Sequence, residues 1–145
     1  MIMDEKKVLM VDDEKMIIEL YRQVFSEAGY LARTAESAEE ALEILKHDQF
    51  FVIFLDLNLP GMNGVELCRK IRKEFPMAII YAVTGYASLF ELSECRDAGF
   101  EDYFTKPAKM NDLLNAAEYA FAKLSRWKKG SQGKRVQKES DDWGM

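Results

Sequence analysis

The sequence predicts an α/β fold in which a doubly wound, five-stranded parallel sheet is covered by helices on both faces. Short apolar segments alternate five times with segments whose apolar residues recur at helical spacing. The central apolar segments contain almost no polar residue, as expected for parallel strands buried on both faces. The length of 145 residues fits one such domain.

The first two strand–helix units have clear boundaries. A strand over residues 7–11 stops at a pair of aspartates, and a helix follows over residues 17–28, where a glycine ends it. A short strand over residues 30–34 precedes a second helix. That helix is expected to begin after Ser37, because Ser37 and Glu40 have the spacing of a capping box.

The last three units repeat this pattern. Three apolar segments are predicted as strands: residues 50–55, 78–83 and 100–104. Asn63 is expected to cap the helix after the first of them. A weakly periodic helix ends at Gly99, and the last helix runs from Met110 to about Trp127.

Charge and composition exclude several function classes. Residues 1–122 carry 13 basic and 22 acidic side chains, which argues against direct nucleic-acid binding. The longest apolar run, residues 50–55, is far shorter than the ~20 residues that span a bilayer, and the first residues lack the apolar region of a signal peptide. Both cysteines, Cys68 and Cys95, fall in predicted helices. We therefore expect a cytoplasmic protein that does not contact a membrane.

The C-terminal residues differ in composition from the rest. Residues 123–145 carry 7 basic and 3 acidic side chains, and from Gly130 onward almost nothing apolar is available to bury except Val136 and Trp143. We expect one domain over residues 1–125 and a flexible basic tail over residues 126–145.

Polar residues follow the predicted strands, where an open parallel sheet binds its ligand. They are Asp12, Asp13, Asp56, Thr84 and Lys106. One pair of carboxylates 4 Å apart costs about 4 kcal/mol at an effective dielectric constant of 20, so a cation is expected among them. Oxygen ligands favour Mg²⁺ over Zn²⁺. The single histidine, His47, is expected at the surface at the end of the second helix.

Each of these residues also has an ordinary structural interpretation. A lone aspartate after a strand is commonly a helix cap. Thr84 and Gly85 fit a plain turn, Lys106 fits a solvated surface residue, and Pro107 fits the start of a helix. Asp56 is harder to explain in this way, since a charge that directly follows six apolar residues requires partners or a metal. The occurrence of all of them at successive strand ends favours a functional site.

Four segments resemble the receiver domain of two-component response regulators. They are residues 8–14, 56–64, 83–86 and 102–107, and the resemblance covers about residues 5–125. It implies a flavodoxin-like sheet with strand order 2-1-3-4-5. It also implies a signalling switch that catalyses only its own phosphorylation and dephosphorylation.

The resemblance also implies roles for single residues. Asp56 corresponds to the phosphoacceptor, which receives a phosphoryl group from a sensor histidine kinase, a histidine phosphotransfer protein or a small acyl phosphate, assisted by Thr84 and Lys106. The Lys106–Pro107 peptide bond is expected to be cis. The residues that correspond to Mg²⁺ ligands are Asp12, acting through water, Asp13, Asp56 and the backbone carbonyl of Asn58.

Signalling and dephosphorylation are assigned by the same resemblance. Thr84 and Tyr103 correspond to a coupled switch, whose output surface is formed by the fourth helix, the fifth strand and the fifth helix. A homodimer through this surface is one expected form of output. Asn58 and Tyr86 correspond to positions that set the rate of dephosphorylation, and the bulk of Tyr86 predicts a slow rate. About 20 residues follow the domain, too few for a second one, so we expect a stand-alone receiver that signals through a protein partner.

Two other functions are compatible with parts of the sequence. A Mg²⁺-dependent aspartyl phosphatase needs a second aspartate two residues after its nucleophile, where this chain has Asn58. A flavodoxin-like binding module, or a degenerate receiver that is never phosphorylated, does not need the intact set of carboxylates, threonine and lysine described above.

Overall fold

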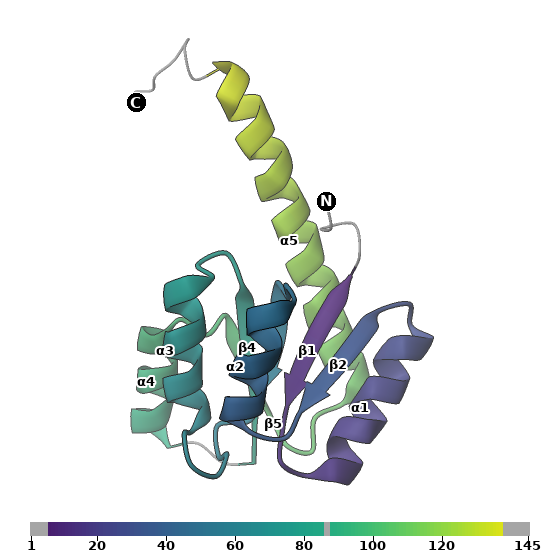
Figure 1. The fold of residues 1–145 in the computed structure, drawn as a ribbon, viewed down its shortest axis with the longest axis vertical. Coiled ribbons are helices and arrows are strands. Elements are labelled where there is room, and N and C mark those ends of the chain that lie inside the picture. Colours follow the sequence, from purple (N-terminus) through teal and green to yellow (C-terminus); the bar gives the residue numbers. More distant parts are fainter. Residues whose placement is uncertain (1–5, 86–87, 138–145) are drawn as a thin grey trace.

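The strand and helix boundaries follow the apolar segments closely. The structure, a computed structural model, describes residues 6–85 and 88–137, and in these ranges five strands alternate with five helices (Figure 1). The strands are β1 (Lys7–Val11), β2 (Leu31–Ala35), β3 (Val52–Leu55), β4 (Ile79–Thr84) and β5 (Asp102–Thr105). The helices are α1 (Lys15–Glu27), α2 (Ala38–His47), α3 (Gly64–Glu74), α4 (Leu89–Ala98) and α5 (Met110–Gln137).

The strands form one parallel sheet in the order β2-β1-β3-β4-β5, which confirms the predicted order. In register, Val11 pairs with Ala35 and with Leu55, and Thr84 pairs with Thr105. The residues that directly follow β1, β3 and β4 therefore emerge at the same edge of the sheet.

The sheet has a hydrophobic core on each face, because successive side chains of a strand point to opposite sides. In β1, Leu9 and Val11 belong to the core under α2, α3 and α4. Val8 and Met10 belong to the core under α1 and α5. Every residue of β3 and β4 is buried, which agrees with their uninterrupted apolar sequences.

Side-chain caps fix where several helices begin. The Asn63 side chain accepts a hydrogen bond from the backbone N–H of Glu66 at 2.9 Å, as predicted. Ser37 caps α2 in the same way, but the Glu40 carboxylate accepts from the backbone N–H of Glu36 at 2.8 Å, so the predicted capping box is only half formed. A complete capping box, which we did not predict, opens α4 at Ser88.

Helix α5 is longer than the sequence suggested. It continues to Gln137 and extends beyond the body of the domain (Figure 1), so the end predicted near Trp127 is wrong. The predicted tail over residues 126–145 therefore begins as helix, and residues 138–145 lie outside the described part of the chain. Lengthening an existing helix is much less costly than starting one, and Lys, Arg and Gln are good helix formers.

Arg72 connects three segments at the end of the sheet opposite the carboxylates. Its guanidinium group donates to the backbone carbonyls of Pro76 at 2.9 Å, Ala78 at 2.5 Å and Gly99 at 2.6 Å. The side chain thus holds the loop before β4 against the end of α4.

Candidate functional site

Three buried polar side chains lie at the edge of the sheet where the strands end. Asp12 is 3% exposed, Asp56 5% and Thr84 1%. The backbone N–H of Asp12 donates to the Ala35 carbonyl at 3.1 Å, and that of Asp56 donates to the Val11 carbonyl at 2.9 Å. The hydrogen-bond ladder of the sheet therefore continues one residue past β1 and β3 and fixes the backbone position of both aspartates.

The ammonium group of Lys106 lies among the carboxylates. Its Nζ is 2.7 Å from an oxygen of Asp12, 3.2 Å from an oxygen of Asp56 and 3.4 Å from an oxygen of Glu14. The Lys106 N–H donates to the Thr84 carbonyl at 2.8 Å, which ties the lysine to the end of β4. The Lys106–Pro107 peptide bond is cis, as the resemblance implied.

The surroundings change the protonation of two of these groups. Burial raises the pKa of Asp12 above its ordinary value, although the hydrogen bond from Lys106 works in the opposite direction. Burial also opposes the charge of Lys106, but the hydrogen bond to Asp12 and the charge of Asp56 raise its pKa above the ordinary value. Lys106 is therefore a cation at neutral pH, and its charge balances part of the negative charge at the edge of the sheet.

Carboxylate oxygens of Asp12, Asp13 and Asp56 lie within 4.8 Å of one another. Oxygen donors at this spacing fit a hard divalent cation such as Mg²⁺, which prefers a few carboxylates and retained waters. Asp13 is exposed, so such an ion remains open to solvent. The three predicted carboxylate ligands thus fit the cation that the resemblance implies.

Asn58 lies beside Asp56 and bridges it to Thr84. The backbone N–H of Asn58 donates to the Asp56 carboxylate at 3.1 Å, and its side-chain amide donates to the Thr84 hydroxyl at 3.2 Å. Five residues predicted for the site are therefore brought together with Asn58: Asp12, Asp13, Asp56, Thr84 and Lys106.

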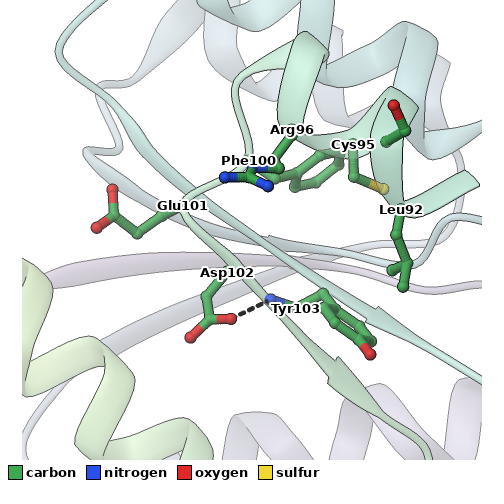
Figure 2. A pocket seen from close by; sticks show the side chains of 8 residues that line it. Leu92, Cys95, Arg96, Phe100, Glu101, Asp102 and Tyr103 are labelled. Carbon is green, nitrogen blue, oxygen red and sulfur yellow. Dashed lines mark hydrogen bonds between the residues drawn. The ribbon is translucent and has the colours of Figure 1, made fainter. Parts of the chain in front are cut away.

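Two other predicted residues, Tyr103 and His47, are not part of this cluster. The position of a third, Tyr86, falls outside the described residues. Tyr103 is 41% exposed and lines a groove of about 510 Å³ between α4 and β5. Figure 2 shows its ring on the same side of this groove as Leu92 of α4. His47 is at the surface at the end of α2, as expected.

The sequence reasoning missed Glu14. Its backbone N–H donates to the Asp12 carboxylate at 2.9 Å, and its own carboxylate contacts Lys106. The available signal was its place directly after the two aspartates. Glu14 is the third carboxylate that Lys106 contacts, besides those of Asp12 and Asp56.

Within the described ranges, no helix combines the length and the apolar character that a membrane crossing requires.

The cysteines are buried: Cys68 of α3 donates a hydrogen bond to the Ala98 carbonyl at 3.5 Å, and Cys95 lies on α4. Burial raises the pKa of Cys68 to about 11, so its thiol stays protonated at neutral pH.

Comparison with known proteins agrees with this geometry. A response regulator named MprA from Mycolicibacterium vanbaalenii is 32% identical over 108 residues, which is 74% of this chain and 47% of that protein. This chain thus spans about half the length of that regulator. A CheY-like receiver domain protein from Methanospirillum hungatei is 32% identical with a TM-score of 0.82, covering 84% of this chain and 98% of that one.

A second solved structure extends the likeness to chemotaxis proteins. CheY4 of Vibrio cholerae is 29% identical with a TM-score of 0.76, covering 80% of this chain and 98% of that one. The family model described as the response regulator receiver domain matches residues 8–118, which include the whole sheet except Lys7 and all the residues brought together at its edge. The chain therefore belongs to the response regulator receiver domain family of two-component systems.

Proposed function

We propose that this protein is a phosphorylation-dependent switch that accepts a phosphoryl group on Asp56, in a Mg²⁺-dependent reaction, from a sensor histidine kinase or a histidine phosphotransfer protein. The observation that carries the proposal is the position of Asp56. Its carboxylate is buried at the end of β3, beside the Lys106 ammonium group and within reach of two further carboxylates.

The chemistry follows from these positions. An Asp56 oxygen attacks phosphorus, the bond from phosphorus to the donor nitrogen or oxygen breaks, and an acyl phosphate forms on the protein. Catalysis of this kind depends on positioning and on neutralising the charge of the transferred group. Lys106 supplies a positive charge, and the Thr84 hydroxyl supplies a hydrogen-bond donor. When bound by Asp12, Asp13, Asp56 and the Asn58 carbonyl, Mg²⁺ supplies further positive charge.

Mass spectrometry tests the proposal directly. The protein is mixed with acetyl phosphate and Mg²⁺, and a gain of about 80 Da, one phosphoryl group, is expected within the lifetime of the acyl phosphate. The Asp56→Asn variant serves as the control and should show no gain. An unmodified wild-type protein, or an equal gain in the variant, contradicts the assignment.

Mg²⁺ is expected to stabilise the folded protein, since the ion relieves repulsion among carboxylates that folding brings together. At ten times its dissociation constant, a ligand that binds only the native state adds about 1.4 kcal/mol to the free energy of unfolding. The measurement is urea unfolding with and without Mg²⁺. Asp13→Asn should reduce the gain, whereas Asp97→Asn, which changes an exposed acid on α4, should keep it. A gain that is the same in both variants argues against this metal site.

We further infer that Tyr103 couples the site to the surface of α4, β5 and α5. The groove beside Tyr103 leaves room for its ring to change position. Phosphorylation of the wild-type protein should therefore change the amide hydrogen exchange of α4. In Tyr103→Ala this change should be lost, and in Tyr119→Ala, which removes an exposed ring from α5, it should remain. If the Tyr103 variant responds like wild type, the coupling runs through other residues.

Tyr86, two residues beyond Thr84, is proposed to slow the loss of the phosphoryl group by shielding it from water. Tyr86→Ala is expected to dephosphorylate several-fold faster than wild type. The decay of the phosphorylated mass after removal of acetyl phosphate measures the rate. Equal or slower decay in the variant rejects shielding.

The output is proposed to be an interaction with a downstream protein, including a second copy of this chain through the α4, β5 and α5 surface. The family match ends at residue 118, before the basic C-terminal part of α5. Light scattering of the phosphorylated protein distinguishes a homodimer from a monomer that needs another partner.

A further inference from the structure

The first residue of α3 lies directly against the backbone of Asp56. Gly64 is buried, and a Cβ atom added to it would meet the Asp56 carbonyl oxygen at 2.3 Å, the Leu57 Cα at 2.8 Å and the Asp56 carbonyl carbon at 3.0 Å. All three are backbone atoms, which cannot rotate away as the end of a flexible side chain can. Any side chain at position 64 therefore forces either α3 or the Asp56–Leu57 peptide to move.

Gly64 is needed for space and not for backbone conformation. Positive φ angles occur among the described glycines at Gly29, Gly61 and Gly99, and Gly64 is not one of them. Its N–H donates to the Leu57 carbonyl at 3.0 Å, and the preceding residue, Asn63, caps the helix. The start of α3 is thus fixed on residues 56 and 57 by a hydrogen bond and by direct contact.

The peptide that Gly64 contacts carries the proposed phosphoacceptor. On its other side, the Asp56 N–H is bonded to the Val11 carbonyl of β1. The Asp56 backbone is therefore held between β1 and the first turn of α3. Its carboxylate reaches Lys106 at 3.2 Å and the Asn58 N–H at 3.1 Å, and both distances depend on where that backbone lies.

We propose that Gly64 is a positioning residue for phosphoryl transfer, because the absence of a side chain there sets the distance of Asp56 from Lys106 and from the other carboxylates. The inference rests on the proposed phosphorylation of Asp56. A Cβ atom at position 64 would lie 2.3 Å from the Asp56 carbonyl oxygen, whereas an ordinary contact between two such atoms is 3.4 Å or more. Restoring that contact requires a shift of about 1 Å. A misplacement of this size can reduce the rate of a positioned reaction by about 100-fold.

The test compares Gly64→Ala with wild type in the rate of phosphorylation by acetyl phosphate and Mg²⁺, expressed per folded molecule. A loss of about 10- to 100-fold is expected. Gly99→Ala is the matched control. There the φ of +104° strains an alanine and its Cβ meets Arg72, so stability falls, but the residue precedes β5 at the opposite end of the sheet. Its rate per folded molecule should equal that of wild type.

Sucrose, which favours the compact state, separates positioning from stability if Gly64→Ala is partly unfolded. A rate deficit that persists once circular dichroism shows full folding supports the proposal. A deficit that disappears with refolding, or a rate equal to wild type, overturns it.

If wild type itself takes up no phosphoryl group, the proposed function fails. NMR then decides the part of the proposal that does not depend on it, namely that Gly64 sets the position of residues 56–58. In that case a displaced Asn58 amide signal in Gly64→Ala, with the same signal unmoved in Gly99→Ala, supports it. An unmoved Asn58 signal overturns it.

Discussion

Lys106→Gln is expected to lower the rate of phosphoryl transfer to Asp56 by about 100- to 1000-fold, the usual effect of removing one group that stabilises charge in a transition state. The ammonium group is held 2.7 Å from Asp12 and 3.2 Å from Asp56. A neutral amide keeps hydrogen-bonding capacity but cannot neutralise the anionic transferred group. The initial rate of phosphorylation by acetyl phosphate at saturating Mg²⁺ measures the effect.

A matched lysine is available as the control. Lys123 on α5 is also ion-paired, to Glu101 at 3.3 Å, but at the end of the sheet opposite the carboxylates. Lys123→Gln should therefore phosphorylate at the wild-type rate. If both variants slow equally, the effect of Lys106 is one of general charge or stability, and the proposed role is wrong.

Arg72→Met is expected to lower the free energy of unfolding by about 2–3 kcal/mol. The substitution removes a charged donor from three backbone carbonyls. A hydrogen bond to a charged group contributes about 1.5–3 kcal/mol, but the half-buried position lets water replace part of the loss. Arg72→Lys should recover only part of the stability, since one ammonium group cannot copy the fork of a guanidinium group.

Urea unfolding measures this effect, and Lys73→Met provides the control. Lys73 is the next residue on α3 and is exposed, so its replacement should change the stability by less than about 0.5 kcal/mol. The rate of phosphorylation per folded molecule should be unchanged in Arg72→Met, because the residue lies at the opposite end of the sheet. If Arg72→Met were as stable as Lys73→Met, the hydrogen bonds of Arg72 would make no net contribution to the free energy of unfolding.

Much of the fold and of the candidate site could be predicted because the relevant signals are local. The strand boundaries lie within two residues of those expected, since each buried strand is a short apolar run that a polar residue ends. Parallel pairing then brings the residues after those runs to one edge without further information. Asp12, Asp56 and Thr84 are found there, buried, as the pattern of the sequence required.

The features that were missed depend on contacts between distant residues or on competing weak preferences. Nothing near Arg72 in the sequence indicates that it bonds to Gly99, which is 27 positions away. The close contact of Gly64 with Asp56 likewise appears only once the loop after β3 is folded. The end of α5 was placed too early because residues from Gly130 onward offer little apolar surface to bury, whereas the helix is continued by local propensity, at a cost of about 1 kcal/mol for each glycine.

The C-terminal part of α5 projects beyond the body of the domain (Figure 1). The helix begins four residues after Lys106, whose ammonium group lies among the carboxylates, and its 28 residues span about 42 Å at 1.5 Å per residue. The helix is held in the core as far as Leu124, which is 2% exposed, so only the 13 residues after it, about 20 Å of helix, project from the domain. A tilt of the packed part of α5 by about 5° would move Gln137 by a further 2 Å or so relative to Leu124, so a small repacking of the core is enlarged at the end of the helix.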